Sequence, residues 1–270
     1  ELAVLVEHLR RSEKSLEQQY ALGRILKETA VASWQEWGRV NPSSTLEEQR
    51  SFFNSEIQPM FTEAIELMRT QNDFAGVAIA YGQEGDIHLN RLSQYPRAVE
   101  LFEKDLKIVQ DYHQINVESP THNRLSASYL GHWKEQWAVV SQQTTPDENW
   151  NKAYDNVLAS IRVAKHREQT INLIFALNHL TDVLMSREIL RISISTKQQF
   201  ASFGEANSTL DVSWKVLLAE LDEISEDILS IDWTMIRKDD FRAFLQSPWV
   251  KISADCPDVE WLQRLNQKLV

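Results

Sequence analysis

Apolar residues recur every three or four positions along most of this 270-residue chain, which is the spacing of one face of an α-helix. The first segment shows the pattern clearly, because Leu5, Leu9, Leu16 and Tyr20 fall on one side of a helix. No stretch of five or more residues alternates between apolar and polar positions as a half-buried strand does. The pattern therefore predicts an all-α protein that begins with one long helix over residues 1–40.

Three short segments have the spacing of a capping box, in which a Ser or Thr hydroxyl and an acidic side chain three residues later satisfy backbone amides at a helix start. They begin at Ser44, Thr145 and Ser208, and they divide the chain into helical blocks. Residues 191–208 are mostly polar, so we predict a linker or mobile loop there. We expect capping helices over residues 209–270.

Internal repetition predicts how the helices pack. Ala64 and Ala98 lie 34 residues apart, and a third copy of their surroundings is centred on Ala153, 55 residues further on. In each copy an aromatic residue precedes the alanine by three positions and a large apolar residue follows it by four, so that all three share one helix face. A period near 34 with two helices per unit is typical of a helical solenoid. We therefore predict a solenoid of antiparallel helix pairs over residues 41–190.

The stretch from Gly85 to Leu106 resembles the end of the first helix, the turn and the second helix of a tetratricopeptide repeat (TPR). The resemblance extends over residues 45–187 and is weaker outside this stretch. Phe52 occupies a position that is usually small in the family, and Pro59 falls where the family turns between its two helices. The resemblance implies a TPR-like solenoid with a concave surface.

In the TPR family, the first helix of each unit lines the concave surface that binds peptides. Asn and Arg side chains on such a surface can hydrogen-bond a peptide backbone or a carboxylate. An ordinary polar helix surface is the alternative interpretation. Carried over by position, the resemblance implies a groove lined by Gln83, Ile87, Asn90 and Arg91 and continued, at four-residue steps in the next helix, by Arg124, Ser128 and His132.

Composition and charge exclude several classes of partner. The chain has 28 Lys and Arg against 39 Asp and Glu, and its net charge is −11. The acidic excess lies at the two ends, and only residues 121–204 are mildly basic. Nucleic-acid binding normally requires a basic footprint, so we expect no nucleic-acid partner. A bilayer span needs about 20 consecutive apolar residues, and because the chain has no such run we expect no membrane partner.

Cysteine and histidine usage limits the chemistry. Cys256 is the only cysteine, which excludes an intrachain disulfide and a Cys-based zinc cage and favours a cytoplasmic location. None of the seven histidines has another histidine three or four positions away, so we predict no metal site. Motifs for a nucleophile elbow, a zinc protease or a phosphate-binding loop are absent, so we expect no cofactor. Gly82 and Gly85 indicate close helix packing, and the initial Glu1 indicates part of a longer protein.

These observations favour a non-enzymatic module that binds a peptide or protein segment and acts as a scaffold or regulatory part of a larger protein. A sensor that binds a small peptide or metabolite in the groove is the first alternative. An enzyme whose site is assembled across helices is the second. Residues 210–231 carry an apolar seam of period 3.5. We expect this seam to cap the solenoid, with a homodimer formed through it as the alternative.

Overall fold

The computed structural model describes most of the first 210 residues. The described residues are 4, 6, 7, 15–113, 115–137, 148–210, 263 and 264.

Every element within these ranges is helical, and none of the described residues forms a strand. The all-α prediction is therefore confirmed for this part of the chain. Two compact units are present, Glu1–Thr121 and His122–Val270. The predicted 210–231 seam and Cys256 lie outside the described residues, apart from Leu210.

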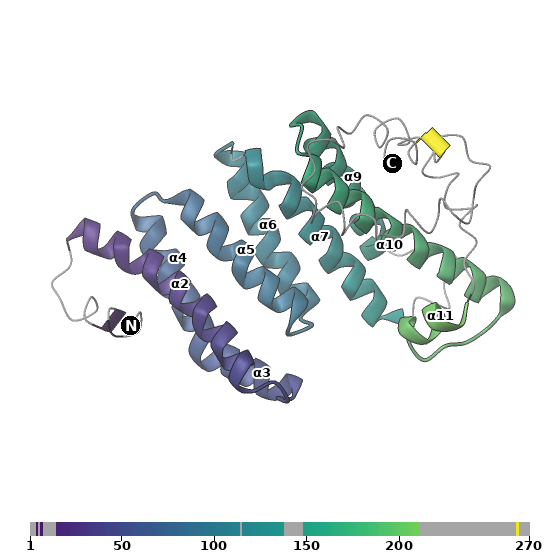
Figure 1. The fold of residues 1–270 in the computed structure, drawn as a ribbon, viewed down its shortest axis with the longest axis horizontal. Helices are drawn as coiled ribbons and strands as arrows, with labels where there is room; N and C mark the ends of the chain where they lie inside the picture. Colours follow the sequence, from purple (N-terminus) through teal and green to yellow (C-terminus); the bar gives the residue numbers. More distant parts are fainter. Residues whose placement is uncertain are drawn as a thin grey trace. The chain divides into compact units, whose positions relative to one another are not determined.

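The first unit is a series of helices joined by short connections, so that consecutive helices run antiparallel. The helix over residues 16–40 (α2) contacts those over residues 58–70 (α4) and 74–90 (α5). The helix α5 contacts α4 and the helix over residues 95–111 (α6). Figure 1 shows these helices following one another from purple to blue. The elements are α2 (Leu16–Val40), α3 (Leu46–Phe52), η1 (Phe53–Ile57), α4 (Gln58–Thr70), α5 (Phe74–Asn90), α6 (Tyr95–Asp111) and the beginning of α7 (Ile115–Glu135).

The predicted turn at Pro59 is wrong, because α3, η1 and α4 form one continuous helix. The five residues of η1 are a π-helical turn, in which the Gln58 amide bonds the carbonyl of Phe53. A π turn directly before a proline allows the helix to continue past a residue that cannot donate a backbone hydrogen bond. Phe53 and Ile57 are both fully buried in this turn, so their burial favours the helical path over a turn.

Three predicted helix starts also lie elsewhere, and a fourth, at Thr145, lies outside the described residues. The helix predicted over residues 1–40 does not run unbroken, because α2 begins at Leu16 with Ser15 as its N-cap.

The capping box of α3 is formed by Thr45 and Glu48, one residue later than the box predicted at Ser44. The Glu48 amide donates to Thr45 Oγ1 at 3.2 Å, and the Thr45 amide donates to Glu48 Oε2 at 2.8 Å. Ser208 lies inside a helix, where its hydroxyl donates to the Glu205 carbonyl, so it does not begin one.

Several helices end on a residue in the left-handed backbone region, and none of these residues is glycine. At the end of α4, the Asp73 amide donates to the Met68 carbonyl at 2.9 Å. At the end of the helix before Glu168, the Gln169 amide donates to the Ala164 carbonyl at 2.8 Å. Both are the closing bond of a Schellman motif. The left-handed residues are Asn72, Ser93, His113, Glu168 and Lys197.

The repeated aromatic–alanine–apolar faces lie in the core. Phe61, Ala64 and Met68 are fully buried in α4. In the second copy, Ala98 and Phe102 of α6 are fully buried, whereas its aromatic residue at position 95 is half-buried. The third copy, Trp150, Ala153 and Val157, is buried as well, so these faces are buried at all but this one position.

At Gly85, α5 lies close against the Phe102 side chain of α6. A Cβ atom at Gly85 would come within 2.7 Å of the Phe102 ring. Because Phe102 is fully buried, the ring has little room to move away. The prediction that this glycine reflects close helix packing is confirmed.

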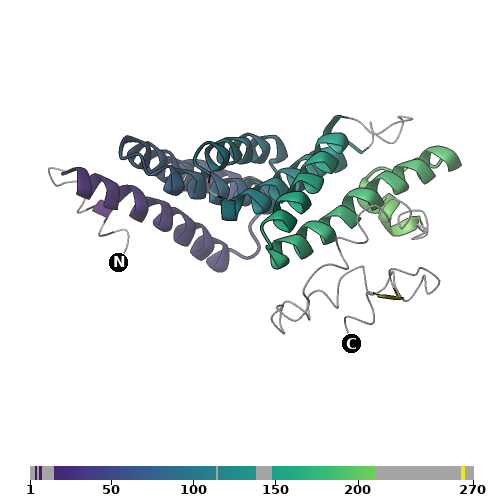
Figure 2. The same cartoon turned by 90° about the horizontal axis from the view of Figure 1, so that it is seen from above.

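The second unit contains the rest of α7 followed by α9 (Glu148–His166), α10 (Thr170–Thr196) and α11 (Phe203–Thr209). The helices α9 and α10 pack side by side (Figure 2). The Trp150 indole of α9 donates to the Val183 carbonyl of α10 at 3.0 Å. The predicted loop over 191–208 is shorter in the structure, because α10 continues to Thr196 and α11 begins at Phe203.

Candidate binding groove

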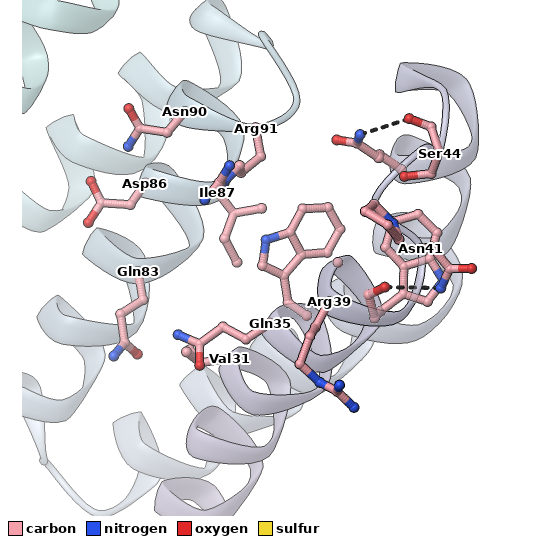
Figure 3. A pocket seen from close by; sticks show the side chains of 15 residues that line it. Val31, Gln35, Arg39, Asn41, Ser44, Gln83, Asp86, Ile87, Asn90 and Arg91 are labelled. Atoms are coloured by element: carbon pink, nitrogen blue, oxygen red, sulfur yellow. Dashed lines mark hydrogen bonds between the residues drawn. The ribbon is translucent and has the colours of Figure 1, made fainter.

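A groove of about 820 Å³ lies in the first unit, between the C-terminal half of α2 with its following loop and one face of α5 (Figure 3). All four α5 residues that the resemblance implied line this groove. These residues are Gln83, Ile87, Asn90 and Arg91.

The two walls come from single helix faces. On α5, Gln83, Ile87 and Asn90 are separated by four and three residues, which places them on one side of the helix. On α2, Val31 and Trp34 show the same spacing and also line the groove. Ile87 is buried and Val31 and Trp34 are half-buried, so these apolar side chains form the floor. Asn90 and Arg91 are exposed and form the rim.

The α2 wall contains a stack of aromatic rings. Trp34 and Trp37 stack with ring centroids 5.9 Å apart and planes inclined by 16°. Phe52 of α3 stacks against Trp37, with centroids 4.8 Å apart. Stacked, partly buried rings have few rotamers to lose on binding, so they present apolar area at a low entropic cost.

Two amide side chains in the groove hold the loop after α2 in place. Asn41 Nδ2 donates to the Trp37 carbonyl at 3.0 Å, and Gln49 Nε2 donates to the Ser44 carbonyl at 3.2 Å. Both bonds appear as dashed lines in Figure 3. These amides therefore shape the groove and are already engaged.

Three other amides have unused hydrogen-bonding capacity. Gln35 of α2 and Gln83 and Asn90 of α5 line the groove, and their side chains make no hydrogen bond to any residue in the described ranges. Gln83 Oε1 is buried and has no donor in this part of the chain. A buried polar atom without a partner costs about 1–3 kcal/mol. A bound molecule that offers an N–H group would remove this cost.

Two arginines line the groove, and they differ in their partners. Arg39 forms a bidentate pair with Glu36 at 2.6 and 2.8 Å. The hydrogen bonds from Arg39 lower the pKa of the Glu36 carboxyl. Arg91 is exposed and pairs with no carboxylate among the described residues. The free positive charge of the groove therefore lies at Arg91.

The three predicted residues of α7 do not line this groove. Arg124, Ser128 and His132 belong to the second unit. Ser128 is fully buried, and its hydroxyl donates to the Arg124 carbonyl at 2.9 Å, so the prediction of an accessible groove residue is wrong there. The His132 ring lies 2.9 Å from Gln136 Nε2 and is half-buried.

No protein-family model matches the chain. No curated protein matches it at a significant level either.

Among the described helices, none combines the length and the apolar character that a bilayer span requires. Within the same residues, no three His, Cys, Asp or Glu side chains gather as a metal site would require.

Proposed function

We propose that this chain is a non-enzymatic, TPR-like solenoid module that binds an extended peptide or protein segment in the groove between α2 and α5. The observation that carries the proposal is the set of unused hydrogen-bonding groups along the groove. Gln35, Gln83 and Asn90 have no partner among the described residues, and Arg91 lies beside them. Gln35, Asn90 and Arg91 are exposed, so they can exchange bonds to water for bonds to a bound molecule. The buried Gln83 Oε1 gains a donor from that molecule.

The chemistry of these groups matches a peptide backbone. Each primary amide offers two N–H donors and one acceptor oxygen, which are the groups needed to pair with a backbone C=O and N–H. An extended segment presents these groups on both sides at regular intervals. The apolar floor around Val31, Trp34 and Ile87 would hold one apolar side chain of that segment. The amides then fix its direction, and the floor supplies buried apolar area.

A random-peptide selection tests the proposal. The whole protein is immobilised, displayed dodecapeptides are selected, and the affinity of the selected synthetic peptides is measured by titration calorimetry. The variant Asn90→Ala with Arg91→Ala is expected to bind these peptides at least about tenfold more weakly, because it removes two rim contacts.

The matched control is Lys107→Ala with Gln110→Ala, which changes two exposed residues of α6. We expect this variant to bind the selected peptides like the unmodified protein. Equal affinities of the groove variant and the unmodified protein would contradict peptide binding in this groove.

A small-molecule sensor is the second candidate, and the groove volume is the observation that favours it. About 820 Å³ falls within the range of small-ligand sites, which is roughly 300–1,000 Å³. A thermal-shift screen with metabolites and short peptides distinguishes the candidates, because a ligand that binds only the folded state raises the Tm. A metabolite whose Tm shift disappears in Asn90→Ala with Arg91→Ala would favour the sensor.

We further propose that the module is a scaffold or regulatory part of a longer, cytoplasmic protein. The single cysteine in the sequence supports a reducing compartment. The predicted seam over 210–231 supports either a cap or a homodimer contact. Sedimentation of a chain that ends near Phe203 distinguishes these two roles. A cap predicts an unchanged oligomeric state with lower stability, whereas a homodimer contact predicts loss of the dimer.

A further inference from the structure

A second pocket in the first unit has an unusual lining. It has a volume of about 470 Å³ and lies where α3 and η1 meet the turn between α5 and α6. Arg50 and Arg97 line it, and none of its described lining residues is acidic. Two carboxylates outside this lining, Glu84 and Glu100, contact Arg97, so the unpaired positive charge of the pocket is that of Arg50.

Arg50 is held in place without being neutralised. Its Nε and Nη2 atoms donate to the Leu92 carbonyl at 3.1 and 2.8 Å. No carboxylate pairs with it in the described ranges. Arg97 differs, because its Nη1 atom donates to Glu100 at 2.7 Å and its Nη2 atom lies 3.6 Å from Glu84. The pocket therefore contains one paired and one unpaired guanidinium.

The N-terminus of α6 adds donors at the same place. Its N-cap residue, Gln94, makes no side-chain bond to the first-turn amides of this 17-residue helix. The Gln94 side chain lies instead with Oε1 at 2.7 Å from Nδ1 of His88. Pro96, the second residue of α6, has no backbone N–H, so the first turn offers at most the amides of Tyr95 and Arg97 to an external acceptor. A helix N-terminus also favours negative charge.

His88 lines the pocket and is held in place by its neighbours. The residue is only 3% exposed, and its ring packs edge-on against Phe53 with centroids 4.8 Å apart. Nδ1 of His88 is engaged by the Gln94 side chain. Nε2 is buried without a hydrogen-bond partner in this part of the chain. The nearest ionic group is Glu84 Oε1, at 3.9 Å.

The outer side of the pocket contributes neutral donors. Asn54 of η1 and Gln58 at the start of α4 line it with amides that form no hydrogen bond to any described residue. Ser93, in the turn before α6, lines it as well, and its hydroxyl has no bond to the described residues. The donors of the pocket thus outnumber its available acceptors.

We propose that this pocket binds a small oxyanion of the phosphate class, with Arg50, Arg97 and the first turn of α6 around the anion. Arg50 keeps its Nη1 group for the anion, because its Nε and Nη2 atoms bond the Leu92 carbonyl. The amides of Asn54 and Gln58 supply further donors. The oxyanion is either free phosphate or the phosphate group of a small monoester, since the pocket has room for an attached organic group. This site is separate from the groove between α2 and α5.

Titration calorimetry of the whole protein with inorganic phosphate and with glycerol phosphate tests the proposal. Ionic strength is held constant with chloride throughout. We expect saturable 1:1 binding, and a tighter monoester would identify the small organic phosphate as the source. Failure of both compounds to bind saturably would overturn the proposal. Displacement of phosphate by chloride at the same concentration would overturn it as well.

Asn54→Asp places a carboxylate in the pocket and removes no described contact, because Asn54 is exposed and unbonded. We expect it to weaken phosphate binding at least about tenfold through charge repulsion. Asn151→Asp, on an exposed position of α9, makes the same change of charge far along the sequence and is expected to leave binding unchanged. Equal weakening in both variants would assign the effect to net charge and overturn the proposed site. Circular dichroism melts verify that both variants are folded.

Discussion

The indole ring of Trp37 lies nearly parallel to the phenyl ring of Phe52, with centroids 4.8 Å apart and planes inclined by 9°. Trp37 is near the end of α2, and Phe52 is the last residue of α3. Trp34 stacks on Phe52 as well, with centroids 6.4 Å apart. The three rings therefore hold one wall of the groove against the following helix.

Phe52→Ala is expected to lower the free energy of unfolding by about 1–3 kcal/mol, because it removes a half-buried ring and its stacking contacts. Urea unfolding followed by circular dichroism measures the change. Phe52→Leu is the control, since it keeps most of the apolar volume and loses only the flat ring. We expect the leucine variant to lose clearly less stability than the alanine variant. Equal losses would show that the ring geometry contributes little.

Alanine substitutions at Gly85 and Gly38 are expected to change the free energy of unfolding in opposite directions. Gly85→Ala would press a methyl group against the buried Phe102 ring and lower the free energy of unfolding by about 1–3 kcal/mol. Gly38 lies inside α2, and no atom is found within 4 Å of a Cβ placed there. Gly38→Ala is therefore expected to raise the free energy of unfolding by about 0.5–1 kcal/mol through helix propensity. A stabilising Gly85→Ala would contradict the close packing of α5 and α6.

The sequence predicted the helices and their buried faces because those features depend on local periodicity. Phe61, Ala64 and Met68 recur at helical spacing, and a helix face of this kind must be buried somewhere. The path of the backbone at Pro59 does not follow from local periodicity. A proline after a helical segment is compatible with a turn and with a π turn inside a helix, and the burial of Phe53 and Ile57 favours the second. That burial comes from tertiary packing, which local pattern does not contain.

Only one wall of the candidate groove contains residues that the sequence had indicated. The family resemblance covers α5 and therefore indicated Asn90 and Arg91, but it does not reach the groove residues of α2. Trp34 and Gln35 meet α5 across about fifty positions of sequence, a pairing that depends on how the first helix packs. Ser128 was misassigned because a serine hydroxyl can bond the carbonyl of the preceding helical turn and so be buried without a further partner.

Glu168→Gly is expected to stabilise the second unit. Glu168 has φ = 55° after the end of α9, and its amide donates to the Lys165 carbonyl at 3.1 Å. A left-handed conformation costs a residue with a side chain roughly 1 kcal/mol compared with glycine. The gain is partly offset by the greater freedom of glycine in the unfolded chain, so we expect a net increase of about 0.5 kcal/mol in the free energy of unfolding. Glu168→Ala, which keeps a Cβ atom, is the control and should show no such gain.

His179 of α10 is expected to make the second unit sensitive to acid. Burial lowers the pKa of its imidazole from 6.5 to about 4, with a further lowering by the charge of Lys134, while a bond to the Ser126 backbone acts in the opposite direction. Two neighbouring groups are also affected by burial, which lowers the pKa of Lys134 and raises the pKa of Asp182. Within the described residues, Nε2 of His179 has no hydrogen-bond partner.

The unfolded chain binds a proton at this histidine more readily than the folded chain does. The stability that depends on the neutral ring is therefore fully present above about pH 6.5 and is lost as the pH falls towards about 4. The shift corresponds to roughly 3 kcal/mol at most.

The test compares the free energy of unfolding of the unmodified protein with that of His179→Gln between about pH 7.5 and pH 4.5. The stability of the unmodified protein relative to this variant should fall with pH, since Lys134 and Asp182 are present in both. His166→Gln, at an exposed position of α9, is the matched control. A constant difference for His179→Gln would contradict the lowered pKa of His179.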